Sequence, residues 1–120
     1  MKKLYLTKEF TFDAAHKLIN YEGKCKNLHG HTYKLQVTIQ GTIQKNGMIL
    51  DFREIKEIIE KNVVSKLDHS FINDFLSQPT AENTILWIWD KLVKKLPLYE
   101  LKLWETPNSS VSYKGENDQK

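Results

Sequence analysis

The sequence predicts an α+β protein in which two helices cover one face of an antiparallel sheet. Two segments near the N-terminus, residues 4–16 and 29–39, alternate between apolar and polar side chains, as half-buried strands do. Two later segments instead repeat apolar residues every three or four positions, which is typical of amphipathic helices. Short alternating segments return near the C-terminus. The predicted order is therefore strand, strand, helix, helix, strand, strand.

Histidines occupy matching ends of the two N-terminal strands. The apolar face of the first strand ends in His16, and the corresponding face of the second strand begins with His29 and His31. Side chains two residues apart on a strand project to the same side, so we expect His29 and His31 to lie together. The polar residues 17–28 predict a connecting loop, which carries the chain's only cysteine.

Two helices are predicted in the middle of the chain. The first covers about residues 52–66 with Asp51 as its N-cap, and the second starts after the N-cap residue Thr80 and stops before Pro97. Residues 67–73 show no periodicity and predict a link. The apolar stripes consist of Phe52, Ile55, Ile59, Val63 and Leu67 in the first helix, and of Ile85, Ile88, Trp89, Leu92, Val93 and Leu96 in the second.

The C-terminal part of the chain predicts two further strands. Leu101, Leu103 and Glu105 share one face of the first, and the second is short, around residues 111–113. Residues 114–120 are polar and predict a frayed tail.

Composition and charge argue against several classes of function. The chain of 120 residues carries 18 basic and 15 acidic side chains, and a formal charge of +3 without a basic run argues against nucleic-acid binding. No apolar run approaches the roughly 18–20 residues that span a bilayer, and the N-terminus lacks the apolar region of a signal peptide. A single cysteine excludes an internal disulfide. We expect one cytoplasmic domain over residues 1–120, without membrane contact.

The three histidines of the strand ends suit a zinc site. Neutral imidazole is a good ligand for Zn²⁺, and three protein ligands leave a fourth position for water or substrate. Antiparallel neighbours lie about 4.5–5.5 Å apart, so His16 can converge with His29 and His31. The alternative is a set of ordinary half-buried histidines at a sheet end. A His-Gly-His with an aligned third histidine favours the metal.

Cys25 has two functional interpretations. It could be a fourth zinc ligand that closes a structural site. It could instead be a thiolate base or nucleophile beside an open zinc ion, because a nearby cation lowers the pKa of a thiol. The alternative is a small buried core residue, which the polar neighbours Lys24, Lys26 and Asn27 disfavour.

Acidic residues complete the candidate site. Asp68 precedes His69 in the link between the helices, where a carboxylate can fix the tautomer of an imidazole. From composition alone, an ordinary polar loop pair is the simpler interpretation. Glu105 ends an apolar strand face and needs a partner. That partner could be a lysine, or the paired N–H donors of a heterocycle with a 2-amino group.

Together these residues resemble the 6-pyruvoyltetrahydropterin synthase superfamily over residues 4 to about 113. The matching pieces, each weak alone and specific in combination, are Phe12-Asp-Ala-Ala-His16, Cys25-x₃-His29-Gly-His31, Gly47-Met-Ile-Leu-Asp51-Phe52, Leu67-Asp-His69, Pro79-Thr-Ala-Glu82-Asn83 and Trp104-Glu105-Thr106. Three residues separate Cys25 from His29. This gap resembles the 6-carboxytetrahydropterin synthase branch, because the pyruvoyl branch usually has a longer one.

The resemblance implies the tunnel fold (T-fold), an α+β architecture with a ββααββ subunit. In this fold three subunits close their sheets into a β-barrel, which removes exposed edges. Two trimers then stack into a homohexamer. Active sites of the superfamily lie between subunits, so neighbouring chains can contribute residues to one site.

The resemblance also implies a reaction in queuosine (7-deazapurine) biosynthesis. It would convert 7,8-dihydroneopterin triphosphate to 6-carboxy-5,6,7,8-tetrahydropterin, acetaldehyde and triphosphate. By the same resemblance, Cys25 would accept a proton and His69, supported by Asp68, would donate one. Glu105 would anchor the pterin ring, with Thr106 close by. The Zn²⁺ ligands would be His16, His29 and His31.

Two alternatives stay open at this point. A 6-pyruvoyltetrahydropterin synthase would eliminate triphosphate but keep the carbon chain, so the release of acetaldehyde distinguishes it. A non-catalytic, zinc-stabilised pterin-binding module would lose metal or folding when Cys25 is replaced. The enzyme would keep both and lose turnover.

Overall fold

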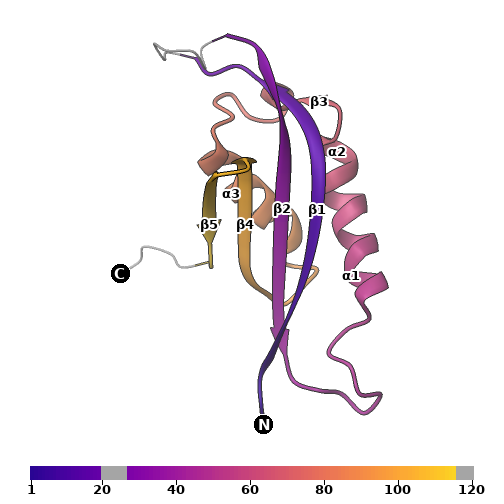
Figure 1. Ribbon diagram of the computed structural model, residues 1–120. Coiled ribbons are helices and arrows are strands. Elements are labelled where there is room, and N and C mark those ends of the chain that lie inside the picture. Colours follow the sequence, from indigo (N-terminus) through magenta and orange to yellow (C-terminus); the bar gives the residue numbers. More distant parts are fainter. Residues whose placement is uncertain (20–26, 116–120) are drawn as a thin grey trace.

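The computed structural model describes residues 1–19 and 27–115, and its main elements follow the predicted order (Figure 1). The strands are β1 (Leu4–His16), β2 (His29–Gly41), β3 (Ser70–Phe71), β4 (Leu98–Thr106) and β5 (Ser109–Tyr113). The first helix, α1 (Phe52–Ile59), continues through a π-helical segment (Glu60–Val64) into α2 (Ser65–Leu67). A 3₁₀ turn (Ile72–Asp74) then precedes α3 (Ala81–Leu92). Most of the polar tail predicted for residues 114–120 lies outside the described residues.

The strands form one sheet in the order β3-β1-β2-β4-β5. β1 and β2 pair antiparallel without interruption from Leu4↔Gly41 to His16↔His29, and the β2–β4 and β4–β5 pairs are also antiparallel. β3 runs parallel to β1. The prediction of antiparallel pairing is therefore right for the long strands and wrong for this short one, which forms where the sequence predicts only a link.

The helices lie on one face of the sheet, and the hydrophobic core fills the space between them and the strands (Figure 1). Alternate strand residues point into this core, so the alternation in the sequence marks the buried face. The buried strand side chains are Phe12, Ala14, Tyr33, Leu35, Val37, Ile39, Leu101 and Leu103, and the helices contribute Ile55, Ile59, Val63, Leu67, Ile85, Ile88 and Leu92. The predicted α+β fold is confirmed.

Side-chain caps define where the helices begin. Asp51 accepts a hydrogen bond from the Arg53 N–H at 2.8 Å, and Thr80 accepts one from the Asn83 N–H at 3.1 Å. Both caps match the prediction. α3 ends earlier than predicted, because the chain after Leu92 continues in turns. In the part of the chain that the structure describes, no helix is long and apolar enough to cross a membrane.

β1 and β2 extend beyond the other long strands (Figure 1). The pairing of β2 with β4 begins at Lys34, so β2 projects past β4 over its first residues. At the same end, the segment after α2, which includes β3, lies along the outer edge of β1. The predicted metal ligands lie at this projecting end of the β1–β2 pair.

Candidate active site

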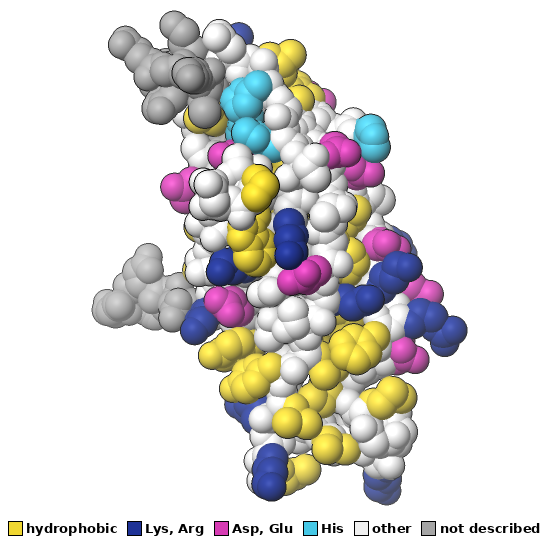
Figure 2. All heavy atoms as spheres, in the orientation of Figure 1, with side chains coloured by type: hydrophobic (Ala, Val, Ile, Leu, Met, Phe, Trp, Pro, Cys, Tyr) yellow, Lys and Arg dark blue, Asp and Glu magenta, His cyan; other side chains and the backbone are white. Residues whose placement is uncertain are grey.

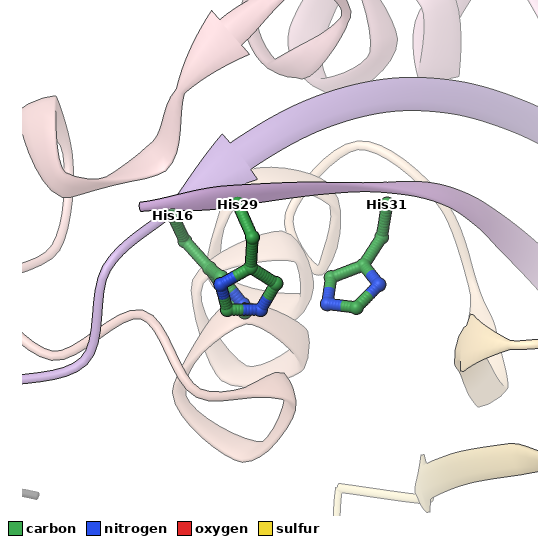
Figure 3. Close-up of side chains that lie close together, drawn as sticks. All are labelled: His16, His29 and His31. Carbon is green, nitrogen blue, oxygen red and sulfur yellow. The ribbon is translucent and has the colours of Figure 1, made fainter. Parts of the chain in front are cut away.

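Three histidine rings meet at the projecting end of β1 and β2. His16 and His29 are cross-strand partners, and His31 lies two residues further along β2. The ring centroids are 4.6, 5.2 and 4.7 Å apart, and one nitrogen of each ring lies within 4.8 Å of the others. Figure 3 shows the rings on one side of the two strands. The structure therefore brings together the residues that strand parity predicts on one face.

Two backbone carbonyls fix the tautomers of His16 and His29. Nδ1 of His16 lies 2.9 Å from the carbonyl oxygen of Pro79, and Nδ1 of His29 lies 2.7 Å from that of Asn27. A carbonyl oxygen only accepts, so each Nδ1 carries a proton and each neutral ring exposes a lone pair on Nε2. The two Nε2 atoms are 3.1 Å apart. Facing lone pairs at this distance repel each other unless a proton or a metal ion binds them.

His31 adds a third nitrogen to this cluster. Its Nε2 is buried and has no hydrogen-bond partner among the described residues, which is costly for a polar atom unless a group from outside the chain binds it. Metal-bound histidines commonly donate their other ring N–H to a carbonyl, as His16 and His29 do here. The donor set therefore fits a divalent metal ion held by three imidazoles, with a fourth position open.

Burial favours the neutral form of His16 and His31. The side chain of His16 is 1% exposed, and this desolvation lowers its pKa, although the Pro79 carbonyl and Glu105 act in the opposite direction. Desolvation also lowers the pKa of His31, again against Glu105. A histidine with a lowered pKa is unprotonated at neutral pH, which is the form that binds a metal.

Glu105 approaches the cluster from β4. Its Oε2 lies 3.7 Å from His16 Nε2, and its side chain is 26% exposed. β4 has a β-bulge at this point, because it has one residue more than β5 between Trp104 and Thr106. Glu105 is that extra residue. With Glu82 at the start of α3, it lines a hollow of about 200 Å³.

Thr106 does not share this hollow in a single chain. Its hydroxyl donates a hydrogen bond to Asn108 Oδ1 at 3.1 Å, within the turn between β4 and β5. It lines a different hollow, together with Trp104 and Lys34. Thr106 is therefore next to Glu105, the predicted ring anchor, in the sequence but does not line the same hollow. Its role stays a prediction.

Asp68 and His69 form a hydrogen-bonded pair. Asp68 Oδ2 lies 3.1 Å from Nδ1 of His69, and Asp68 Oδ1 accepts a hydrogen bond from the Asp13 N–H at 2.9 Å. The hydrogen bond from the Asp13 N–H is the main cause that lowers the pKa of the Asp68 carboxyl, and the hydrogen bond with His69 lowers it further. His69 has a φ of 61°, a left-handed conformation that is uncommon outside glycine. Its side chain is 79% exposed.

This pair lies apart from the three-histidine cluster within one chain. Asp13, Asp68 and His69 form one group of possible metal ligands, and the three histidines of β1 and β2 form another. Figure 2 shows histidine side chains at two separate places on the surface. A hollow of about 460 Å³ is lined by His69 and Asp13 and reaches His31. Of the three histidines, His31 alone lines this hollow, so the Asp68–His69 pair and the cluster do not share it as a common site within one chain.

The sequence analysis missed the groups around His16. Pro79 contributes a backbone oxygen from 63 positions away. Its sequence signals, a place before the N-cap residue Thr80 and in one of the matching motifs, do not indicate this contact. The Tyr33 hydroxyl lies 3.2 Å from His16 Nδ1. Strand parity puts Tyr33 on the histidine face but says nothing of this contact. Cys25 lies outside the described residues, so its role also stays a prediction.

Comparisons with known proteins agree with this fold. The family model described as 6-pyruvoyl tetrahydropterin synthase matches residues 5–116. The 6-carboxy-5,6,7,8-tetrahydropterin synthase of Haemophilus influenzae is 37% identical over 90% of this chain and 96% of its own. The 6-pyruvoyl tetrahydrobiopterin synthase of Dictyostelium discoideum is 35% identical over 96% of this chain and 98% of its own.

A solved structure shows the same architecture. The 6-pyruvoyl tetrahydropterin synthase of Caenorhabditis elegans superposes with a TM-score of 0.88 at 27% identity, covering 97% of this chain and 98% of its own. The resemblance predicted from short motifs is confirmed, and so is the prediction of a tunnel-fold enzyme. Since the family model spans nearly all of the sequence and the relatives match over almost their whole length, the chain belongs to the 6-pyruvoyl tetrahydropterin synthase family.

Proposed function

We propose that the chain is a zinc-dependent carbon–carbon lyase. It converts 7,8-dihydroneopterin triphosphate and one water molecule to 6-carboxy-5,6,7,8-tetrahydropterin, acetaldehyde and triphosphate, in queuosine (7-deazapurine) biosynthesis. The observation that carries the proposal is the three-histidine cluster, in which carbonyls fix two tautomers and a third nitrogen is buried without a partner in the described chain. The relative from Haemophilus influenzae bears the name of this activity.

The choice between two reactions rests on one spacing. The relatives named for the carboxy and the pyruvoyl product are 37% and 35% identical to this chain, so identity does not discriminate between them. The three residues between Cys25 and His29 resemble the carboxy branch. The alternative is a 6-pyruvoyltetrahydropterin synthase, which eliminates triphosphate and keeps the carbon chain.

The chain's own side chains supply binding and proton transfer in this proposal. Zinc, when bound by the three histidines, would act as a Lewis acid on the hydroxyls of the substrate side chain. We assign Glu105 to the pterin ring, because its carboxylate lies beside the cluster and borders a hollow. A carboxylate can accept the paired N–H donors of a 2-amino heterocycle. Cys25 accepts a proton, and His69, oriented by Asp68, donates one.

We also propose that the active protein is a homohexamer, a dimer of trimers with sites between subunits. The Asp68–His69 pair lies apart from the metal cluster in one chain, and His69 is 79% exposed. In addition, β3 covers the outer edge of β1 only at Ala14 and Ala15. The described residues place no other strand on that edge. An open edge of this kind is a template for pairing with another chain.

The products test the proposed reaction. Purified protein is incubated with 7,8-dihydroneopterin triphosphate, the acetaldehyde, triphosphate and pterin products are quantified, and the metal content is measured on the same sample. We expect equal amounts of acetaldehyde and triphosphate, with zinc stoichiometric with the chain. Triphosphate release with a pyruvoyl product and no acetaldehyde would assign the alternative reaction instead.

A further inference from the structure

Two side-chain amides hold the chain where it leaves β1. The Lys17 N–H donates to Asn73 Oδ1 at 2.9 Å, and Asn73 Nδ2 donates back to the Lys17 carbonyl at 2.8 Å. Gln78 makes the same pair of bonds with Ile19, both at 2.8 Å. These contacts join residues 56 and 59 positions apart. Residues 17–19, which directly follow His16, are therefore tied to a distant segment.

The two side-chain amides hydrogen-bond to the backbone after β1 in place of a neighbouring strand. Each uses its carbonyl oxygen and its NH₂ group as a backbone residue of a neighbouring strand would. They follow β3, so one segment, residues 68–78, occupies the edge from Asp13 to Ile19. This fixes the position of the segment relative to His16.

Gln78 is also next to the acceptor of His16. Pro79 is buried, and its carbonyl accepts the Nδ1–H of His16 at 2.9 Å. The Gln78 carbonyl accepts hydrogen bonds from Asn83 Nδ2 and from the Thr80 N–H, each at 2.9 Å. The Gln78 side chain thus contacts the chain after β1, and its carbonyl contacts the first turn of α3. Gln78 also directly precedes Pro79, whose carbonyl binds His16.

We propose that Gln78, supported by Asn73, is a positioning residue of the metal centre. Its amide holds the Pro79 carbonyl against His16, and so maintains the tautomer that presents Nε2 to a metal ion. No side-chain substitution removes a backbone carbonyl, so the sequence can control the Pro79 carbonyl only through neighbouring side chains, and Gln78 is the one that ties it to the chain after His16. The inference rests on the proposed function in one respect, namely that the three histidines bind a divalent cation.

Gln78→Glu tests this role with little change of shape. Glutamate keeps the oxygen that accepts the Ile19 N–H but replaces the NH₂ donor with a second oxygen, which repels the Ile19 carbonyl. We expect the dissociation constants for Co²⁺ and Zn²⁺, measured by chelator competition, to rise about tenfold, the low end of the range for partners of metal-bound histidines. A new negative charge alone would tighten cation binding, so weaker binding reports positioning.

Gln44→Glu is the matched control. Gln44 also donates its Nε2–H to a backbone carbonyl, that of Thr42, at 2.9 Å. It lies in the loop between β2 and α1, at the opposite end of the molecule from the cluster (Figure 1). We expect Gln44→Glu to leave metal affinity unchanged. Asn73→Asp breaks the other amide pair and should weaken Co²⁺ binding less than Gln78→Glu, because Asn73 is further from Pro79 in the chain.

Two further measurements separate positioning from folding. Gln78→Met has a similar length and no charge, and lacks both hydrogen bonds, so it should also weaken binding and serves if the glutamate variant does not fold. The absorption spectrum of bound Co²⁺ reports the geometry of its ligands. We expect its bands to shift in both Gln78 variants, which a general loss of stability would not cause. Thermal unfolding of the metal-free proteins compares their folds.

The outcomes decide between the inference and the proposed reaction. Unchanged Co²⁺ affinity and spectrum in the folded Gln78 variants would overturn the positioning role, and so would an equal loss of affinity in Gln44→Glu. The expected loss in the Gln78 variants alongside a product assay without acetaldehyde would support the positioning role and overturn the proposed reaction.

Discussion

At the scale of single residues, Asp68 carries a carboxylate that the folded chain stabilises. Its two oxygens interact with the Asp13 N–H and with His69 Nδ1, and the pKa of the carboxyl is lowered as a result. A carboxyl with a lowered pKa stabilises the fold above its unfolded pKa, about 3.9 for aspartate, and this contribution is lost as the pH falls through the folded value.

Asp68→Asn should remove this pH dependence. Above about pH 5 we expect the variant to be less stable than the wild type, and the difference should shrink as the pH falls below about 3.9. Urea unfolding across this range, at one protein concentration, measures it. Asp74→Asn, at an exposed position, is the control. A stability difference that stays constant with pH would contradict the assigned interactions.

Cys25→Ala distinguishes catalysis from metal binding. If Cys25 is the proton acceptor, the variant keeps its zinc and its assembly, while the turnover number falls about 10²- to 10⁴-fold. Steady-state kinetics and metal analysis of the same preparation measure both quantities. Loss of zinc or of the folded state would instead support the fourth-ligand interpretation and the non-catalytic binding module.

The residues of the site differ in how far the sequence predicts them. The period of two along a strand predicts that His29 and His31 share a face, and β1–β2 pairing places His16 opposite His29. The Pro79 contact is a property of the tertiary fold, because any residue type has a carbonyl. The approach of Glu105 coincides with a bulge in β4 that the alternation of side chains does not reveal.

At the scale of secondary structure, Thr80→Ala and Asp51→Ala form a matched pair. Each removes an N-cap side chain, so each should lower the free energy of unfolding by about 1 kcal/mol. Because Thr80 directly follows Pro79, we expect only Thr80→Ala also to weaken Co²⁺ binding. Denaturant unfolding and cobalt titration measure the two effects. Equal losses of cobalt affinity would show that the effect comes from stability alone.

Elements differ in predictability for physical reasons. Amphipathic periodicity predicts a helix over about residues 52–66, and the observed helical run ends at Leu67 despite its π-helical segment. A long apolar stripe outweighs such a local irregularity. β3 has only two residues, Ser70 and Phe71, which is too short to show any period. Its formation depends on the edge of β1, which becomes available only in the folded chain.

At the scale of the whole molecule, the outer edge of β1 is the feature that bears on assembly. The Asp13 N–H and carbonyl both bond outward, to Asp68 and His69 respectively. Since the β1–β2 register is uninterrupted, every second residue toward the N-terminus also presents its backbone groups to that edge. Thr11 is the first of these.

Thr11→Pro should weaken the proposed oligomer while the subunit stays folded. Proline removes an N–H that points away from β2, so the internal ladder is kept and the open edge is blocked. Sedimentation velocity of Thr11→Pro, with Thr11→Val as the control that retains the N–H, measures the assembly. A hexamer of undiminished stability in Thr11→Pro would show that this edge does not join subunits.

The position of the three histidines along the chain also has a consequence for biosynthesis. His16, His29 and His31 all precede residue 32, whereas the acceptor of His16 is Pro79. Because synthesis proceeds from the N-terminus, the growing chain contains all three imidazoles while the residue that orients one of them is still untranslated. If the three histidines bind a metal ion as proposed, the growing chain could bind it before Pro79 is available to select the His16 tautomer.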